Sequence, residues 1–205
     1  MRKQSYFLLV AAIAAALFCG LAVAVGTNRV ARFDSAVRMD LHSVASPPLT
    51  LLVEKATYLG ALGVLALLGA VAVAVLIRAR RRDAALFLIV TMSGALALEN
   101  GLKFAFQRAR PPPFFGTEPM TYSFPSGHAL FSVCFYGALA ITASRSTPSI
   151  AIKTGIWIAT IFLVLAIGAT RIYLGVHYPS DVLGGYLVAM AWIATVLSAE
   201  RRLAQ

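Results

Sequence analysis

Three short polar clusters interrupt a sequence of 205 residues that is otherwise mostly apolar. The first contains Lys103, Arg110 and Pro111, the second reads Pro-Ser-Gly-His at 125–128, and the third runs from 170 to 181. Together they supply cations that attract phosphate oxygens, two histidines that can attack phosphorus or transfer protons, and a carboxylate. This combination of residue types suits phosphate ester chemistry.

The third cluster carries the most reactive groups. Pro179 is accommodated in the first turn of a helix, so we expect the last helix to begin between Pro179 and Asp181, with His177 just outside it. The Asp181 carboxylate can then accept the ring N–H of His177, which fixes the tautomer and leaves the other ring nitrogen as a nucleophile. The alternative is that Asp181 only caps the helix.

The second cluster precedes another apolar run and has the form of a helix start. Gly127 lets the backbone approach a ligand closely, and the first N–H groups of a helix lack internal partners, so an anion is well placed there. Ser126 adds a hydroxyl donor, and His128 could protonate a leaving oxygen and later deprotonate water. The alternative is a serine cap followed by a histidine at the bilayer interface.

Cations of the first and third clusters complete the predicted anion site. Arg110 and Arg171 can each grip two phosphate oxygens, and Lys103 adds a point charge. The alternative for each of them is a side chain that extends along lipid towards the headgroups, and this is the role we expect for Arg108. Glu99 lies four residues before Lys103, the favourable order for an ion pair within a helix.

The elements that must position these residues are membrane helices. Hydrophobic residues form 60% of the chain and charged residues 13%, which indicates an integral membrane protein. A helical span needs about 20 apolar residues, and the abundance of Ala and Leu argues against barrel strands. We predict an all-α bundle of six transmembrane helices in one domain, 1–205, built on the runs 6–25, 56–77, 84–98 extended to about 106, 129–143 extended back to 126 or 127, 150–169 and 182–199.

Basic residues alternate between the two sides of such a bundle. Because basic loops are retained in the cytoplasm, the larger set and both termini are expected there, which leaves the three polar clusters together on the outer face of the cytoplasmic (inner) membrane. The net charge of +10 therefore reflects topology rather than nucleic-acid binding. The set assigned to the cytoplasm comprises Arg2, Lys3, Arg78, Arg80, Arg81, Arg82, Arg145, Lys153, Arg201 and Arg202.

Other segments have simpler interpretations. The link 27–48 is either a short amphipathic helix at the interface or an irregular connector, and His42 within it is expected to be a solvated loop residue. Cys19 and Cys134 both fall within predicted spans, where a packing role is expected. The first apolar run is longer than the core of a signal peptide, so we predict an uncleaved span.

The three clusters follow one another as Lys-x6-Arg-Pro, Pro-Ser-Gly-His and Thr-Arg-x5-His-x3-Asp. In this order and spacing, the sequence resembles the type 2 phosphatidic acid phosphatase superfamily, the membrane lipid phosphatases related to bacterial phosphatidylglycerophosphatase B. The signature covers residues 103–181, and the six-helix layout extends the resemblance over nearly the whole chain. Thr170 stands where the family usually has serine, which retains the hydroxyl and adds a methyl group.

The resemblance implies hydrolysis of the phosphate monoester or pyrophosphate headgroup of a membrane lipid in two steps, without a metal or another cofactor. His177 would form a phosphohistidine while Asp181 orients its ring, and His128 would protonate the departing oxygen and then assist water. The residues expected to bind the phosphate oxygens are Lys103, Arg110, Ser126, Gly127 and Arg171.

The motifs recognise only the phosphate that many lipids share. Phosphatidic acid, phosphatidylglycerophosphate, undecaprenyl pyrophosphate and a phosphorylated lipid A all remain open as substrates, and so does the oligomeric state. A transporter or lipid-binding protein could use the same basic site without hydrolysis, although it would not require two histidines and an aspartate at these spacings. A vanadate-dependent haloperoxidase has a similar anion site, but such proteins are soluble.

Overall fold

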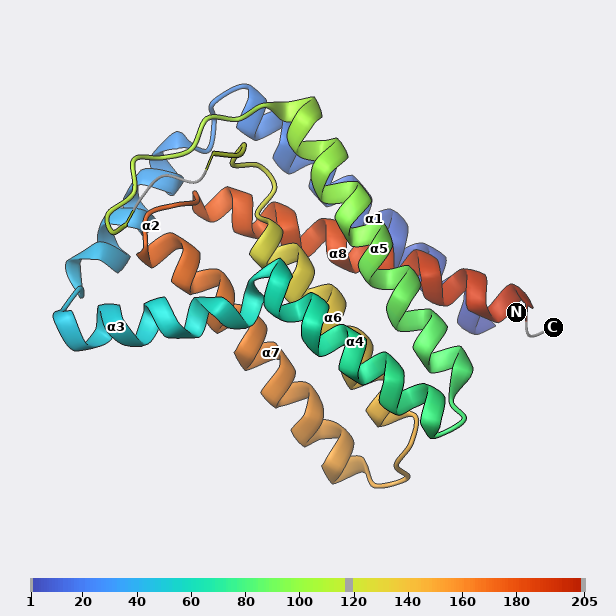
Figure 1. Ribbon diagram of the computed structural model, residues 1–205. Coiled ribbons are helices and arrows are strands. Elements are labelled where there is room, and N and C mark those ends of the chain that lie inside the picture. Colours follow the sequence, from blue (N-terminus) through green and yellow to red (C-terminus); the bar gives the residue numbers. More distant parts are fainter. Residues whose placement is uncertain (1, 117–119, 204–205) are drawn as a thin grey trace.

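The computed structural model describes residues 2–116 and 120–203, and every regular element within them is a helix, as the sequence predicts (Figure 1). The side chains of Arg2, Lys3, Arg201 and Arg202 lie outside the described part. In chain order the elements are α1 (Arg2–Gly26), α2 (Ala31–Ser43), α3 (Pro47–Ala56), the 3-10 helix η1 (Thr57–Gly60), α4 (Leu62–Arg78), α5 (Arg82–Phe106), α6 (Gly127–Ser144), α7 (Ile150–Tyr173) and α8 (Pro179–Leu203).

Five of the described helices, α1, α5, α6, α7 and α8, are long and apolar enough to cross a membrane. A sixth crossing results only if α3 with η1 and α4 count as one span, because the two parts meet at a bend of 50°. The predicted second span, 56–77, is therefore a continuous α-helix only from Leu62 onwards, and α4 is not by itself among the helices long enough to cross a membrane. Its first residues form η1, and the extended backbone of Ala61 separates them from α4.

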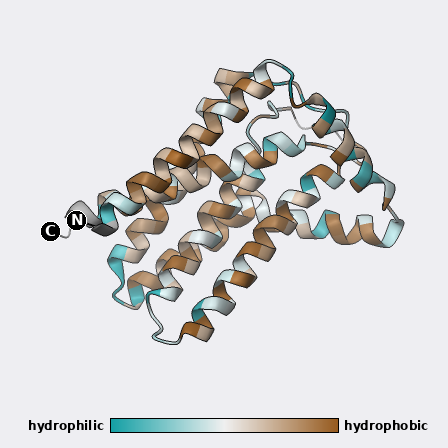
Figure 2. Ribbon diagram, turned by 180° about the vertical axis from the view of Figure 1, so that it is seen from behind, coloured by the Kyte–Doolittle hydropathy of each residue, from teal (hydrophilic) through white to brown (hydrophobic). Residues whose placement is uncertain are grey.

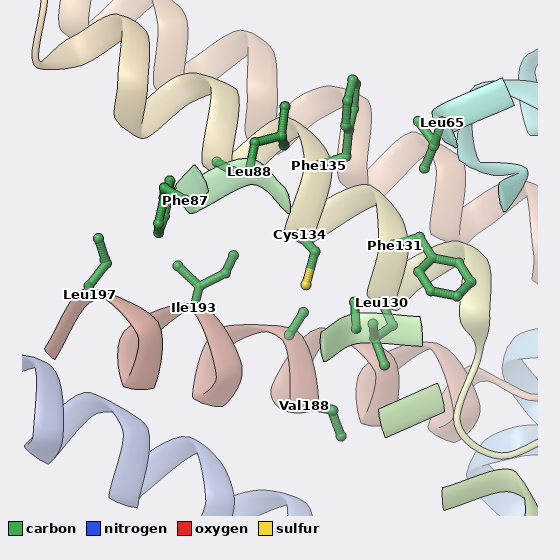
Figure 3. Packing of buried hydrophobic residues seen from close by; sticks show 13 residues of the cluster. Leu65, Phe87, Leu88, Leu130, Phe131, Cys134, Phe135, Val188, Ile193 and Leu197 are labelled. Carbon is green, nitrogen blue, oxygen red and sulfur yellow. The ribbon is translucent and has the colours of Figure 1, made fainter. Parts of the chain in front are cut away.

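Helix α6 lies at the centre of the bundle. Its buried residues pack against α4, α5 and α8 in one continuous apolar cluster that surrounds Cys134 (Figure 3). Cys134 is fully buried there without a disulfide, in agreement with the packing role predicted for it, whereas Cys19 on α1 is exposed. The outward sides of the helices carry many large apolar side chains, and the hydrophilic residues gather towards the ends of the bundle (Figure 2).

Close contact between α6 and α8 depends on glycine. A β-carbon added at Gly185 would lie 2.6 Å from the Ser126 carbonyl oxygen and 2.9 Å from the β-carbon of Ala129, so no larger residue fits without moving a helix. The backbone N–H of Ser126 donates to the Asp181 carbonyl oxygen at 2.9 Å beside this contact. The starts of α6 and α8, which carry the second and third polar clusters, are thereby held together.

The link 27–48 contains the amphipathic helix that was one of its two predicted forms, so the irregular connector is wrong for residues 31–43. Helix α2 packs over the ends of α7 and α8 that face the polar clusters, and its Val37 and Leu41 lie against a buried cluster of Ala129, Ile172 and Val182. His42 is part of this helix, and its ring stacks on Phe114 with the centroids 4.0 Å apart. The expectation of a solvated loop residue is wrong because the segment after α5 folds back over α2.

The bundle has two different ends. One end holds the start of α1, the end of α8 and the connections 79–81 and 145–149 (Figure 1). The opposite end holds α2 and the segment that joins α5 to α6. Arg78, Arg80 and Arg145 thus lie far from the three polar clusters, which is the separation that the charge pattern predicts.

Candidate active site

His177 lies in the tight connection between α7 and α8. The chain can reverse there because Gly175 adopts a positive φ of 77°, a conformation that favours glycine. The carbonyl oxygen of Leu174 accepts the backbone N–H of Phe114 at 3.0 Å, which fastens the connection to the segment after α5. His177 consequently points into the protein and is only 2% exposed.

The partners of His177 determine its tautomer. Nη1 of Arg110 lies 3.0 Å from Nε2 of the ring, and because a guanidinium group can only donate, Nε2 must accept. The proton of the neutral ring is then on Nδ1, which lies 3.3 Å from Oδ2 of Asp181. The lone pair on Nε2 therefore faces the guanidinium group of Arg110, a cation that can also bind phosphate oxygens.

Burial keeps this ring uncharged. It is the main cause that lowers the pKa of His177 to about 4; Asp181 opposes the change, and the charges of Arg110 and Arg171 add to it. At neutral pH the imidazole is therefore in the form that can attack phosphorus.

Asp181 combines the two roles that the sequence leaves as alternatives. It is the third residue of α8 and accepts the backbone N–H of Tyr178 at 2.8 Å, so it caps the helix. The same oxygen faces Nδ1 of His177 and accepts the hydroxyl of Ser123. The carboxylate is fully buried, and each of its oxygens has at least one donor.

Arg108 does not extend towards lipid headgroups, so this expectation is wrong. Gln107 ends α5 in a left-handed conformation with φ of 45°, which redirects the chain over the bundle and brings Arg108 inward. Its guanidinium group donates to Asp181 at 2.5 Å and to Asp34 on α2 at 2.8 Å. It also stacks over the Tyr178 ring at 4.1 Å.

The predicted phosphate-binding cations each have a supporting partner. Lys103 pairs with Glu99 at 2.5 Å, which confirms the predicted ion pair. Arg110 donates to the carbonyl oxygens of Thr121 at 2.6 Å and Val176 at 2.7 Å, so it ties the segment before α6 to the one before α8.

The guanidinium group of Arg171, on α7, is held by a hydrogen bond to a residue of η1. It donates from Nη1 to the hydroxyl of Thr57 at 2.8 Å, and Thr170 donates to the same hydroxyl at 3.1 Å. Thr170, at the position where the related family usually has serine, thus forms a hydrogen bond to Thr57 through its hydroxyl. The Nε atom of Arg171 is buried and has no hydrogen-bond partner among the described residues.

The Pro-Ser-Gly-His cluster begins α6 as predicted. Ser126 is the fully buried N-cap residue, yet its side chain makes no capping hydrogen bond, and its Oγ has no partner within the described chain. The simple serine cap is therefore not what the structure shows. A β-carbon at Gly127 would lie 2.8 Å from Oε1 of Glu99, which places the carboxylate that pairs with Lys103 directly against the second cluster.

His128 is half-buried and lies within range of charge interactions with Lys103, Arg110, Arg171 and His177. The structure thus brings the predicted residues of all three clusters to one end of the bundle. Ser126 Oγ and Arg171 Nε, both buried and unpaired, are the kind of donors that an anion would satisfy.

Sequence reasoning missed several supporting residues. Asp34, Thr57 and Ser123 each contact a predicted site residue or Arg108, and all three are polar groups without a recognisable spacing to the motifs. Asp34 is 1% exposed although it lies in a link rich in charge, so only its burial distinguishes it from Asp40 nearby.

Comparisons with known proteins agree with this arrangement. The model of the PAP2 superfamily matches residues 84–204. Phosphatidylglycerophosphatase B of Bacillus subtilis is 30% identical over 175 residues, which are 84% of this chain and 86% of that protein. Undecaprenyl-diphosphatase of Sulfolobus acidocaldarius is 30% identical over 125 residues, covering 58% and 56% of the two chains. The crystal structure of a transmembrane PAP2 type phosphatidylglycerolphosphate phosphatase from Bacillus subtilis superposes with a TM-score of 0.86 at 26% identity, over 95% of this chain and 97% of that one.

Proposed function

Since this chain belongs to the PAP2 superfamily, we propose that it hydrolyses the phosphate monoester or pyrophosphate headgroup of a membrane lipid. The relatives named above are phosphatases of this kind. The observation that carries the proposal is the environment of His177, whose Nε2 lone pair faces Arg110 while its Nδ1–H faces Asp181. A binding protein or transporter would gain nothing from a histidine whose tautomer is set in this way.

In the first proposed step, Nε2 of His177 attacks phosphorus and the bond from phosphorus to the lipid oxygen breaks. Arg110 turns from Nε2 to the phosphate oxygens, which Lys103, Arg171, Ser126 and the Gly127 backbone also bind. These groups act by positioning and by stabilising charge, the main contributions to catalysis of phosphoryl transfer.

Proton transfers complete the first step. His128 donates its proton to the departing oxygen, so an alcohol leaves from a monoester and a lipid monophosphate leaves from a pyrophosphate. The positive charge that develops on the ring of His177 is balanced by Asp181, which accepts the Nδ1–H.

In the second step, water attacks the phosphohistidine and gives a proton to His128. The bond between phosphorus and Nε2 breaks, inorganic phosphate leaves, and both histidines return to their starting states. Every group that this cycle needs is supplied by the chain and by water.

We place this reaction at the outer face of the cytoplasmic membrane. The basic connections 79–81 and 145–149 lie at the end of the bundle away from the site, and basic loops are retained in the cytoplasm. Phosphatidylglycerophosphate, undecaprenyl pyrophosphate and phosphatidic acid are the substrate candidates, since all present a phosphate at the membrane surface.

The test is phosphate release by the purified protein in mixed micelles, with these three lipids at equal surface concentration. We expect release from at least one lipid, and we expect His177→Ala to abolish it because the nucleophile is lost. His42→Ala is the matched control: its ring packs on Phe114 outside the site, so activity should remain. A folded parental protein that binds these lipids but releases no phosphate would instead indicate a binding or transport role.

A further inference from the structure

We propose that Asp34 and Arg108 are positioning residues for the nucleophile, which they orient through Asp181. The proposal rests on the proposed function, because it assumes that His177 attacks phosphorus. Neither residue belongs to the three motifs, and within the described part of the chain neither forms a hydrogen bond or ion pair with the ring of His177.

Arg108 joins two buried carboxylates. Its Nη1 donates to Oδ1 of Asp181 at 2.5 Å, and its Nη2 donates to Oδ2 of Asp34 at 2.8 Å. The first contact occupies the oxygen of Asp181 that does not face His177. A guanidinium group is planar and rigid, so Arg108 sets the rotation of the Asp181 carboxylate and thereby the direction of the oxygen that receives Nδ1–H.

Asp34 holds Arg108 from the opposite side and is itself held by α8. Its carboxylate accepts the backbone N–H of Ser180 at 2.9 Å and the Ser180 hydroxyl at 2.7 Å. Arg108 also donates to that hydroxyl at 2.8 Å. The side chains of Asp34, Arg108, Ser180 and Asp181 are thus linked in one hydrogen-bond network.

Helix α2 carries Asp34 and is fixed independently one turn further on. Arg38 donates to the carbonyl oxygen of Pro112 at 2.8 Å and to that of Gly175 at 3.3 Å. These contacts hold α2 to the segment after Arg110 and to the turn before His177. We therefore expect α2 to stay in place when Asp34 is changed, so the effect of Asp34 on Asp181 can be measured separately from the packing of α2.

Charge gives the network a second effect. Asp34, Arg108 and Asp181 together carry one negative charge, the same as Asp181 alone. When His177 attacks, its ring becomes positive, and this net negative charge stabilises it. Without the charge of Asp34 the group becomes neutral, so we expect the chemical step to slow while substrate binding, which uses other residues, stays unchanged.

The experiment compares Asp34→Asn with Asp40→Asn, the same change at an exposed position of the same helix. We expect Asp34→Asn to lower kcat by about tenfold to a hundredfold with KM unchanged, the range for residues that orient a reacting group. Asp40→Asn should keep the parental values. Arg108→Lys retains the charge but cannot bridge two carboxylates, so it should also lower kcat, and Asp34→Glu should restore part of it.

A readout that does not need turnover separates this proposal from the proposed function. In protein labelled with 15N-histidine, His177 of the parental chain and of Asp40→Asn should show the single tautomer with the proton on Nδ1 at neutral pH. Asp34→Asn and Arg108→Lys should keep this tautomer, which Arg110 also enforces, but their Nδ1–H proton signal should move upfield, because a carboxylate that is no longer oriented by Arg108 forms a weaker hydrogen bond with Nδ1. The chain has three histidines, so the His42 and His128 variants assign the signals.

The outcomes are distinct. Parental kcat and an unchanged Nδ1–H proton signal of His177 in both Asp34→Asn and Arg108→Lys would overturn the positioning role, and so would a change in KM alone. If the parental protein releases phosphate from no lipid, the proposed function fails while the histidine spectra still test the network. If Asp34→Asn does not fold, Arg108→Lys and Asp34→Glu decide by the same two measurements.

Discussion

At the scale of single residues, the chemistry of this site is set by hydrogen-bond direction. A histidine between a carboxylate and an arginine has one tautomer available, because the first group only accepts and the second only donates. His177 has these two neighbours at 3.3 Å and 3.0 Å. The motif residues are therefore not only close together but also in compatible protonation states, which spacing in the sequence does not guarantee.

The first prediction concerns the titration of His177. Because its pKa in the folded chain is about 4, below the ordinary value of 6.5, its 15N signals should titrate near pH 4 rather than near 6.5. The folded state binds fewer protons than the unfolded state between these values. The contribution of His177 to stability is therefore complete above about pH 6.5 and is lost as the pH falls towards 4.

Unfolding measurements in detergent between about pH 4 and pH 6.5 test this pH dependence of stability. The parental chain should lose free energy of unfolding as the pH falls from 6.5 to 4, and His177→Gln should lose less, since glutamine does not titrate. A midpoint for His177 near 6.5, or equal pH dependence in both proteins, would contradict the prediction.

At the scale of helices, the site depends on how closely their ends approach one another. Gly185 allows α6 and α8 to touch, and Gly60 allows η1 to lie against α7 and α6. The contact at η1 bears on the proposed function because Thr57, in the same short helix, accepts a hydrogen bond from Arg171. The two short helices α2 and η1 thus support residues that lie on or next to the long helices.

The second prediction tests η1. A β-carbon at Gly60 would collide with Ile167 and lie 3.2 Å from the ring of His128. Gly60→Ala should therefore push η1 outward and separate Thr57 from Arg171, with a loss of about 1–3 kcal/mol in the free energy of unfolding. The rate of lipid hydrolysis should also fall. Both quantities can be measured on the purified protein in detergent.

Gly63→Ala provides the control, because a β-carbon there meets nothing within 4 Å. It lies on the next helix and should leave activity unchanged, with stability unchanged or slightly raised by the better helix propensity of alanine. Equal effects of the two substitutions would show that the contact of η1 with the site has no special role.

At the scale of the whole molecule, the fold places the three polar clusters and the basic connections at opposite ends of the bundle. The apolar sides of the helices face outward between two polar ends, with the motif residues at one end and the basic connections at the other (Figure 2). This arrangement lets the protein present its site at one membrane surface only.

The third prediction concerns orientation. In a chain with Cys19 and Cys134 changed to alanine, Met120→Cys and Ala79→Cys place single exposed thiols at the two ends. A thiol reagent that does not cross membranes should label Met120→Cys in intact cells and Ala79→Cys only after permeabilisation. The reverse pattern would place the site on the cytoplasmic side.

Most of the helical architecture could be predicted because it depends on local properties. The length and apolar character of each run determine where a membrane helix can form, and the predicted starts near Gly127 and Pro179 agree with the structure. The second span is the exception. Whether 56–61 continues α4 or forms η1 depends on contacts with Ile167 and His128, which are distant in sequence.

The sequence by itself determined the apolar helices and the residues of the three motifs, because hydropathy and spacing are properties of neighbouring positions. Only the tertiary structure decided the partners that orient those residues. Arg108 meets Asp181 across 73 positions, and Asp34 meets Ser180 across 146. An isolated arginine or aspartate looks the same in the sequence whether it faces lipid, solvent or a buried partner, and its burial follows from the packing of the whole chain.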